Sequence, residues 1–159
     1  MCVNLAYIEI MNDLVMLSKD LIIAYKNEEL AVEAFKEYRF RKGITCKKCG
    51  GSDHYWLSSK QQFQCKKCRF RTTLQSGTLL EGSKLPVSYF FIALHLLIKK
   101  GNALTVEEFQ QQTGHKYSEP LYDFLRKIRL YLKTNNQNSI LIDFIEVVNE
   151  HFIVLKVED

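Results

Sequence analysis

The stretch Cys46–Cys68, CKKCGGSDHYWLSSKQQFQCKKC, contains two identical Cys-Lys-Lys-Cys motifs and decides the fold of the chain. Its spacing is C-x2-C-x15-C-x2-C. Two residues between paired cysteines let the backbone fold back, so that both sulfurs face one ion. Two such pairs supply four thiolates, the ligand set of a closed, tetrahedral structural zinc site. The stretch therefore predicts a zinc ion held by Cys46, Cys49, Cys65 and Cys68, with no coordination position open for catalysis.

Two other uses of paired cysteines compete with zinc. Redox-active pairs lie where a strand turns into a helix, and neither motif has that context. An iron–sulfur centre also takes four thiolates, and the sequence alone leaves it open. Zinc is favoured because the spacing and the short β-like segments between the motifs fit a ribbon. Cys2 lies apart from the motifs and is interpreted as an ordinary free thiol.

The residues around the cysteines favour a small antiparallel sheet with a basic surface. Three aromatic or β-branched segments lie between turns rich in Gly, Ser and Cys, and they predict strands at His54–Leu57, Gln62–Gln64 and Phe70–Leu74. We interpret six cations as contacts to nucleic-acid phosphates: Lys47, Lys48, Lys66, Lys67, Arg69 and Arg71. For the interleaved aromatics Tyr55, Trp56, Phe63 and Phe70, packing within the ribbon is favoured over base stacking.

The charge of the chain is segregated along its length. The total is +4, but residues 39–84 carry 11 basic and 2 acidic side chains, net +9, and residues 85–133 carry 7 and 4, net +3. Residues 1–38 and 134–159 are each net −4. A basic zone between acidic ends predicts a surface for a polyanion, although a solvated basic face would have the same composition.

Helical signals flank the ribbon. Residues 3–18 are apolar with scattered acids and predict a helix. A second helix is predicted from the cap Asn27 to the stop Gly43, with a buried stripe of Ala31, Ala34, Phe35 and Tyr38. A third begins with Pro86 in its first turn and ends at Gly101.

The last two predicted helices form a helix-turn-helix pair. Thr105 and Glu108 make a capping box at the start of the first, which ends near Gly114. The second runs over Ser118–Lys133. In such pairs the early residues of the second helix lie near base edges in the major groove. We therefore expect contacts to DNA from Tyr117, Tyr122, Arg126 and Arg129, with both arginines presented outward.

The composition and the N-terminus limit the class of protein. The chain has 47% hydrophobic and 25% charged residues, which excludes low-complexity and disordered classes. No apolar run approaches the roughly 20 residues that cross a bilayer, and no secretory signal begins the chain. We expect a cytoplasmic protein, associated with the nucleoid if it binds DNA.

The run from Ala31 to Arg129 resembles the N-terminal zinc-ribbon and helix-turn-helix region of DDE-type insertion-sequence transposases. The elements that carry the resemblance are Ala31–Tyr38, Gly43, Cys46-x-x-Cys49-Gly50, Phe63-x-Cys65-x-x-Cys68, Ser76–Pro86, Ile92–Leu97 and Leu125-x-Lys-Ile-Arg129. Lys47 departs from the family, where proline is common. The resemblance implies DNA binding by this region.

In that family an RNase H-like domain with three catalytic carboxylates follows. Asp143 resembles the place of the first of these, but no further scaffold for converging carboxylates follows it in the sequence. We therefore expect that the catalytic domain is lacking, that Asp143 is a surface or capping residue, and that the chain is not an enzyme.

These patterns predict an α+β fold in which a four-cysteine zinc ribbon lies between an N-terminal helical segment and a three-helix helix-turn-helix unit. The expected parts are a helical cap over 1–43, the ribbon over 44–84, the helix-turn-helix domain over 85–133 and an acidic tail over 134–159. The leading hypothesis is a non-catalytic DNA-binding protein, a regulator, accessory subunit or remnant, with RNA as an alternative ligand.

A second hypothesis is a protein-interaction module. The acidic ends and the apolar segment Phe152–Leu155 could dock on a larger nucleic-acid machine such as RNA polymerase or the ribosome. Zinc is the only cofactor expected under either hypothesis. No membrane and no small-molecule substrate is expected.

Overall fold

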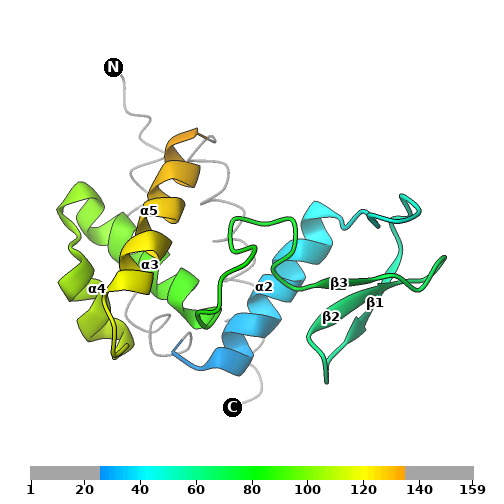
Figure 1. The fold of residues 1–159 in the computed structure, drawn as a ribbon, viewed down its shortest axis with the longest axis horizontal. Helices are drawn as coiled ribbons and strands as arrows, with labels where there is room; N and C mark the ends of the chain where they lie inside the picture. The colour runs from blue at the N-terminus through cyan, green and yellow to red at the C-terminus, as the bar shows by residue number, and fades with distance from the viewer. Residues whose placement is uncertain (1–25, 135–159) are drawn as a thin grey trace, which may run out of the picture.

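The computed structural model describes residues 26–134 and places a small sheet and three helices on opposite sides of a central helix (Figure 1). The helices are α2 (Glu28–Lys42), α3 (Ser88–Lys100), α4 (Val106–Thr113) and α5 (Glu119–Thr134), with a 3₁₀ turn η1 (Gly101–Ala103). The antiparallel sheet has the order β1 (His54–Leu57), β2 (Gln62–Cys65), β3 (Arg71–Thr73). The α+β class is confirmed. The helix predicted over 3–18, Cys2, Asp143 and Phe152–Leu155 lie outside the described residues.

Helix α2 begins and ends where its capping residues predict. The side chain of Asn27 accepts a hydrogen bond from Glu29 N at 2.9 Å, and Gly43 ends the helix with φ +83°. Ala31, Ala34 and Phe35 of the predicted stripe are buried. The apolar face of α2 therefore forms part of the core.

Two long-range contacts of α2 join the ribbon to the helical unit. The carboxylate of Glu28 accepts hydrogen bonds from Val87 N and Ser88 N, at 2.7 and 2.9 Å. It caps the start of α3, where Val87 supplies no side-chain cap. Pro86 lies one residue before this cap and not in the first turn of α3, because the helix begins where Glu28 satisfies the free amides.

The second contact is made by the buried Arg39. Its guanidinium donates to Leu74 O and Ser76 O, both at 2.7 Å, and lies 5.3 Å from the ring centroid of Phe63. These bonds satisfy two loop carbonyls that no strand or helix pairs. Arg39 therefore fixes the chain that leaves β3 against the end of α2.

The sheet has one covered and one open face. Trp56, Phe63 and Thr72 are register partners on the face toward α2, where the rings of Phe40 and Phe63 lie 5.1 Å apart. The alternation of side chains along a strand places Tyr55, Gln64 and Arg71 on the opposite face. No helix of the described part packs on that face.

Helices α3, α4 and α5 pack around a core that includes the fully buried Phe109, Leu121, Leu125 and Ile128. The predicted capping box of Thr105 and Glu108 is present at the start of α4. Gly114 ends α4 in the left-handed conformation, at φ +69°. Within residues 26–134 no helix has the length and apolar character that crossing a membrane requires.

Candidate metal centre

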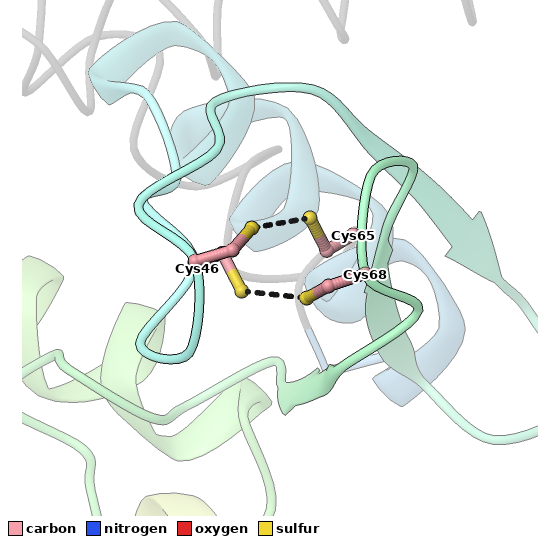
Figure 2. A group of neighbouring side chains, drawn as sticks. Cys46, Cys65 and Cys68 are labelled. Carbon is pink, nitrogen blue, oxygen red and sulfur yellow. Dashed lines mark hydrogen bonds between the residues drawn. The ribbon is translucent and has the colours of Figure 1, made fainter.

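The four cysteines converge on one point between two loops. Their Sγ atoms all lie within 4.8 Å of one another, with 3.4 Å between Cys46 and Cys68 and 3.5 Å between Cys49 and Cys65. Figure 2 shows Cys46 facing Cys65 and Cys68 from the opposite loop. A tetrahedral zinc ion with Zn–S bonds of about 2.3 Å separates its sulfurs by roughly 3.8 Å. The cluster is therefore positioned to bind a metal ion, as the spacing predicted, and fits zinc.

The two loops have the same backbone geometry. The carbonyl of the first cysteine in each accepts a hydrogen bond at 2.9 Å, from Gly50 N in one loop and from Arg69 N in the other. Both residues have positive φ, +73° for Gly50 and +63° for Arg69. Glycine adopts this conformation freely, whereas any other residue loses roughly 1–2 kcal/mol there. The Cys-x-x-Cys turn therefore imposes its geometry on Arg69.

Backbone amides lower the pKa of the first cysteine of each loop. The N–H of Cys49, assisted by that of Lys48 at 3.4 Å, lowers the pKa of Cys46 to about 6. The N–H groups of Cys68 and Lys67 lower the pKa of Cys65 in the same way. A loop that presents its amides to sulfur prepares the ligand that zinc requires.

The fourth sulfur shows why the cluster needs a cation. The N–H of Phe70 favours the thiolate of Cys68, but burial and the three neighbouring sulfurs raise the pKa of Cys68 to about 12. Four thiolates this close repel one another. A divalent ion removes that repulsion and allows all four to be deprotonated.

Gly51 is a site residue that the sequence reasoning missed. A Cβ atom on Gly51 would lie 3.3 Å from both Cys49 Sγ and Cys65 Sγ. Its backbone carbonyl accepts a hydrogen bond from Cys46 N at 2.8 Å. The double glycine after Cys49 was the available signal, since a second glycine often marks close backbone approach.

We expect Gly51→Ala to weaken the metal site without abolishing it. The new methyl group forces two ligand sulfurs apart, at a cost of about 1–3 kcal/mol. The measurement is zinc retention against a chelator series, with Ser52→Ala as the matched neighbouring control. Equal retention in Gly51→Ala and the unaltered chain would show that the sulfurs have room to move.

Five of the predicted phosphate contacts lie free on the ribbon surface. They are exposed and have no carboxylate partner within the described residues: Lys48, Lys66, Lys67, Arg69 and Arg71. Lys47 differs, because its ammonium donates to Ser76 Oγ at 3.0 Å and lies 3.8 Å from the carboxylate of Glu81. Among the six predicted phosphate contacts, those without a carboxylate partner in the described part of the chain therefore lie around the second cysteine motif and at Lys48.

The residues predicted to contact DNA bases in and just before α5 have different environments. Tyr117 and Tyr122 are 59% and 60% exposed. Arg126 is exposed and lies 3.8 Å from Asp123. The expectation that Arg129 points outward is wrong, because its half-buried guanidinium donates to Leu104 O. That carbonyl precedes the cap of α4 and has no helical donor, so Arg129 joins α5 to α4.

The comparison with known families agrees with the geometry of the ribbon. Residues 26–71 match the transposase zinc-ribbon domain, a stretch that contains α2 and both cysteine motifs. No curated protein and no solved structure is significantly similar to the chain. The first part of the described chain is therefore a transposase-like zinc ribbon.

Proposed function

We propose that the chain binds DNA through the ribbon and the helical unit and performs no strand transfer itself. The observation that carries this proposal is a group of five exposed cations, without carboxylate partners among residues 26–134, beside a four-cysteine cluster positioned to bind a metal. Such cations release counterions from a phosphate backbone, which favours binding of any nucleic acid. The match to a transposase zinc ribbon supports DNA as the ligand.

In this proposal the helical unit recognises the DNA sequence. Helices α4 and α5 are joined by the short turn after Gly114, as in a helix-turn-helix pair. Tyr117, Tyr122 and Arg126 lie exposed at the turn and on the first half of α5. We place these three side chains in the major groove and assign Arg129 to holding α5 on α4.

The chemistry of the metal centre supports binding in preference to catalysis. Among residues 26–134 the four cysteines are the group of His, Cys, Asp and Glu side chains arranged to hold a metal. Four sulfurs complete a tetrahedral shell and leave no position for substrate or water. The role is that of a non-catalytic module that resembles the N-terminal region of a DDE-type transposase: a regulator, accessory subunit or remnant.

The test is the salt dependence of binding by the full chain to duplex DNA. If the five free cations contact phosphates, the logarithm of the association constant falls with a slope of roughly −4 to −5 against the logarithm of salt concentration. Fluorescence anisotropy over a salt series measures this slope. Absent or salt-insensitive DNA binding would overturn the proposal and favour the protein-interaction hypothesis.

A further inference from the structure

The open face of the sheet carries a row of three polar and aromatic side chains. Tyr55, Gln64 and Arg71 are consecutive register partners across β1, β2 and β3. Tyr55 is 56% exposed, whereas Trp56 and Phe63 pack together with ring centroids 4.9 Å apart on the covered face. Packing within the ribbon therefore accounts for Trp56 and Phe63 but leaves the ring of Tyr55 in solvent.

Positive charge surrounds the exposed ring. Lys66 Nζ lies 5.0 Å from the ring centroid of Tyr55, and Arg71 projects from the same row. Residues 44–73 contain seven basic side chains and a single acidic one, Asp53. The Lys66 ammonium lies over the Tyr55 ring, so a base that stacks on this side takes its place and frees it to pair with a flanking phosphate.

Whether the ligand is single-stranded or double-stranded follows from which base faces are accessible. In a duplex each base is stacked between its neighbours, so a protein side chain can reach base edges in the grooves but not the face of a base. An unpaired base presents its whole face. We propose that this sheet face binds single-stranded nucleic acid, with a base stacked on Tyr55 and its phosphates held by Lys66 and Arg71. The proposal rests on the proposed DNA binding and adds a strand preference to it.

The experiment compares two probes on the full zinc-loaded chain: a 12-nucleotide oligothymidine and a 12-base-pair duplex. We expect Tyr55→Ala to weaken oligothymidine binding by roughly fivefold or more and to leave duplex binding within about twofold. Tyr55→Phe keeps the ring and should bind as the unaltered chain does. Thr73→Ala, on the same sheet face but outside the row, is the matched control. Zinc content is measured for every variant.

The outcomes separate this inference from the proposed function. Duplex binding with no Tyr55-dependent loss on oligothymidine overturns the stacking proposal and leaves DNA binding intact. If the unaltered chain binds neither the oligothymidine nor the duplex, both proposals are overturned. An equal loss in Tyr55→Ala and Thr73→Ala also overturns stacking, because it shows a general effect of the sheet face. A pair of oligodeoxyuridine and oligouridine probes, which differ only in the 2′-hydroxyl, tests whether the sugar matters. Equal loss on both in Tyr55→Ala supports recognition of the base.

Discussion

Cys65→Ser is expected to remove zinc from the purified chain and to unfold residues 44–75, while α3, α4 and α5 stay folded. The ribbon is too small to form a core without metal, and structural zinc contributes on the order of 10–16 kcal/mol to such folds. The helical unit has its own buried residues, including Phe109 and Leu125, and makes no contribution to the metal site.

Metal analysis and hydrogen exchange measure the two parts of this result. The unaltered chain should hold about one zinc per chain, and protection should be lost only in the ribbon of the variant. Cys2→Ser serves as the matched cysteine control and should keep its zinc. A metal-free but fully protected ribbon in Cys65→Ser would contradict the assignment, as would a different metal in the unaltered chain.

Reversing the charge of Lys48, Lys66 and Lys67 to Glu together should produce the second large effect. Their ammonium groups are exposed and make no ion pair among the described residues, so the change removes contacts to ligand without breaking an ion pair. It also removes the Lys66 ammonium from the Tyr55 ring, whose centroid is 5.0 Å away. Three phosphate contacts are worth on the order of 100-fold or more in affinity at about 0.1 M salt, and their loss flattens the salt slope by about 3. Lys47 is left unchanged because it is bonded to Ser76.

The loss should be the same on every DNA sequence, since phosphates carry no sequence information. Tyr122→Ala is the contrasting variant. If the Tyr122 ring touches a base, the substitution should reduce discrimination between DNA sequences by about 1–3 kcal/mol and leave the salt slope unchanged. Binding isotherms on several duplexes measure both effects. Unchanged affinity in both variants would favour docking on a protein.

Local signals were enough to predict most elements of this fold. The cysteine spacing predicted the metal cluster, and the strand at His54–Leu57 has the predicted bounds. The caps at Asn27, Thr105 and Gly114 lie where the sequence placed them. Each of these features depends on residues within a few positions of one another, which is the range that periodicity and capping rules describe.

The features that were missed depend on distant residues. Glu28 caps a helix that begins 60 residues later, and Arg39 binds a carbonyl 35 residues away. Arg129 lies on the face predicted to be outward, but an unpaired carbonyl at Leu104 binds it. Gly51 matters in part because the fold brings Cys65 of the second loop to 3.3 Å from the position of its missing Cβ. No rule based on neighbouring residues identifies such partners, because folding alone brings them together.

The left-handed backbone of Arg69 has a consequence for how this ribbon can change during evolution. A side chain there lowers stability by about 1–2 kcal/mol relative to glycine, a loss that zinc binding outweighs several-fold. Once the metal fixes the backbone, a surface residue no longer has to favour the backbone conformation at its position. Substitutions that would unfold a metal-free hairpin can then accumulate, and selection can act on charge and shape at the surface with few structural constraints.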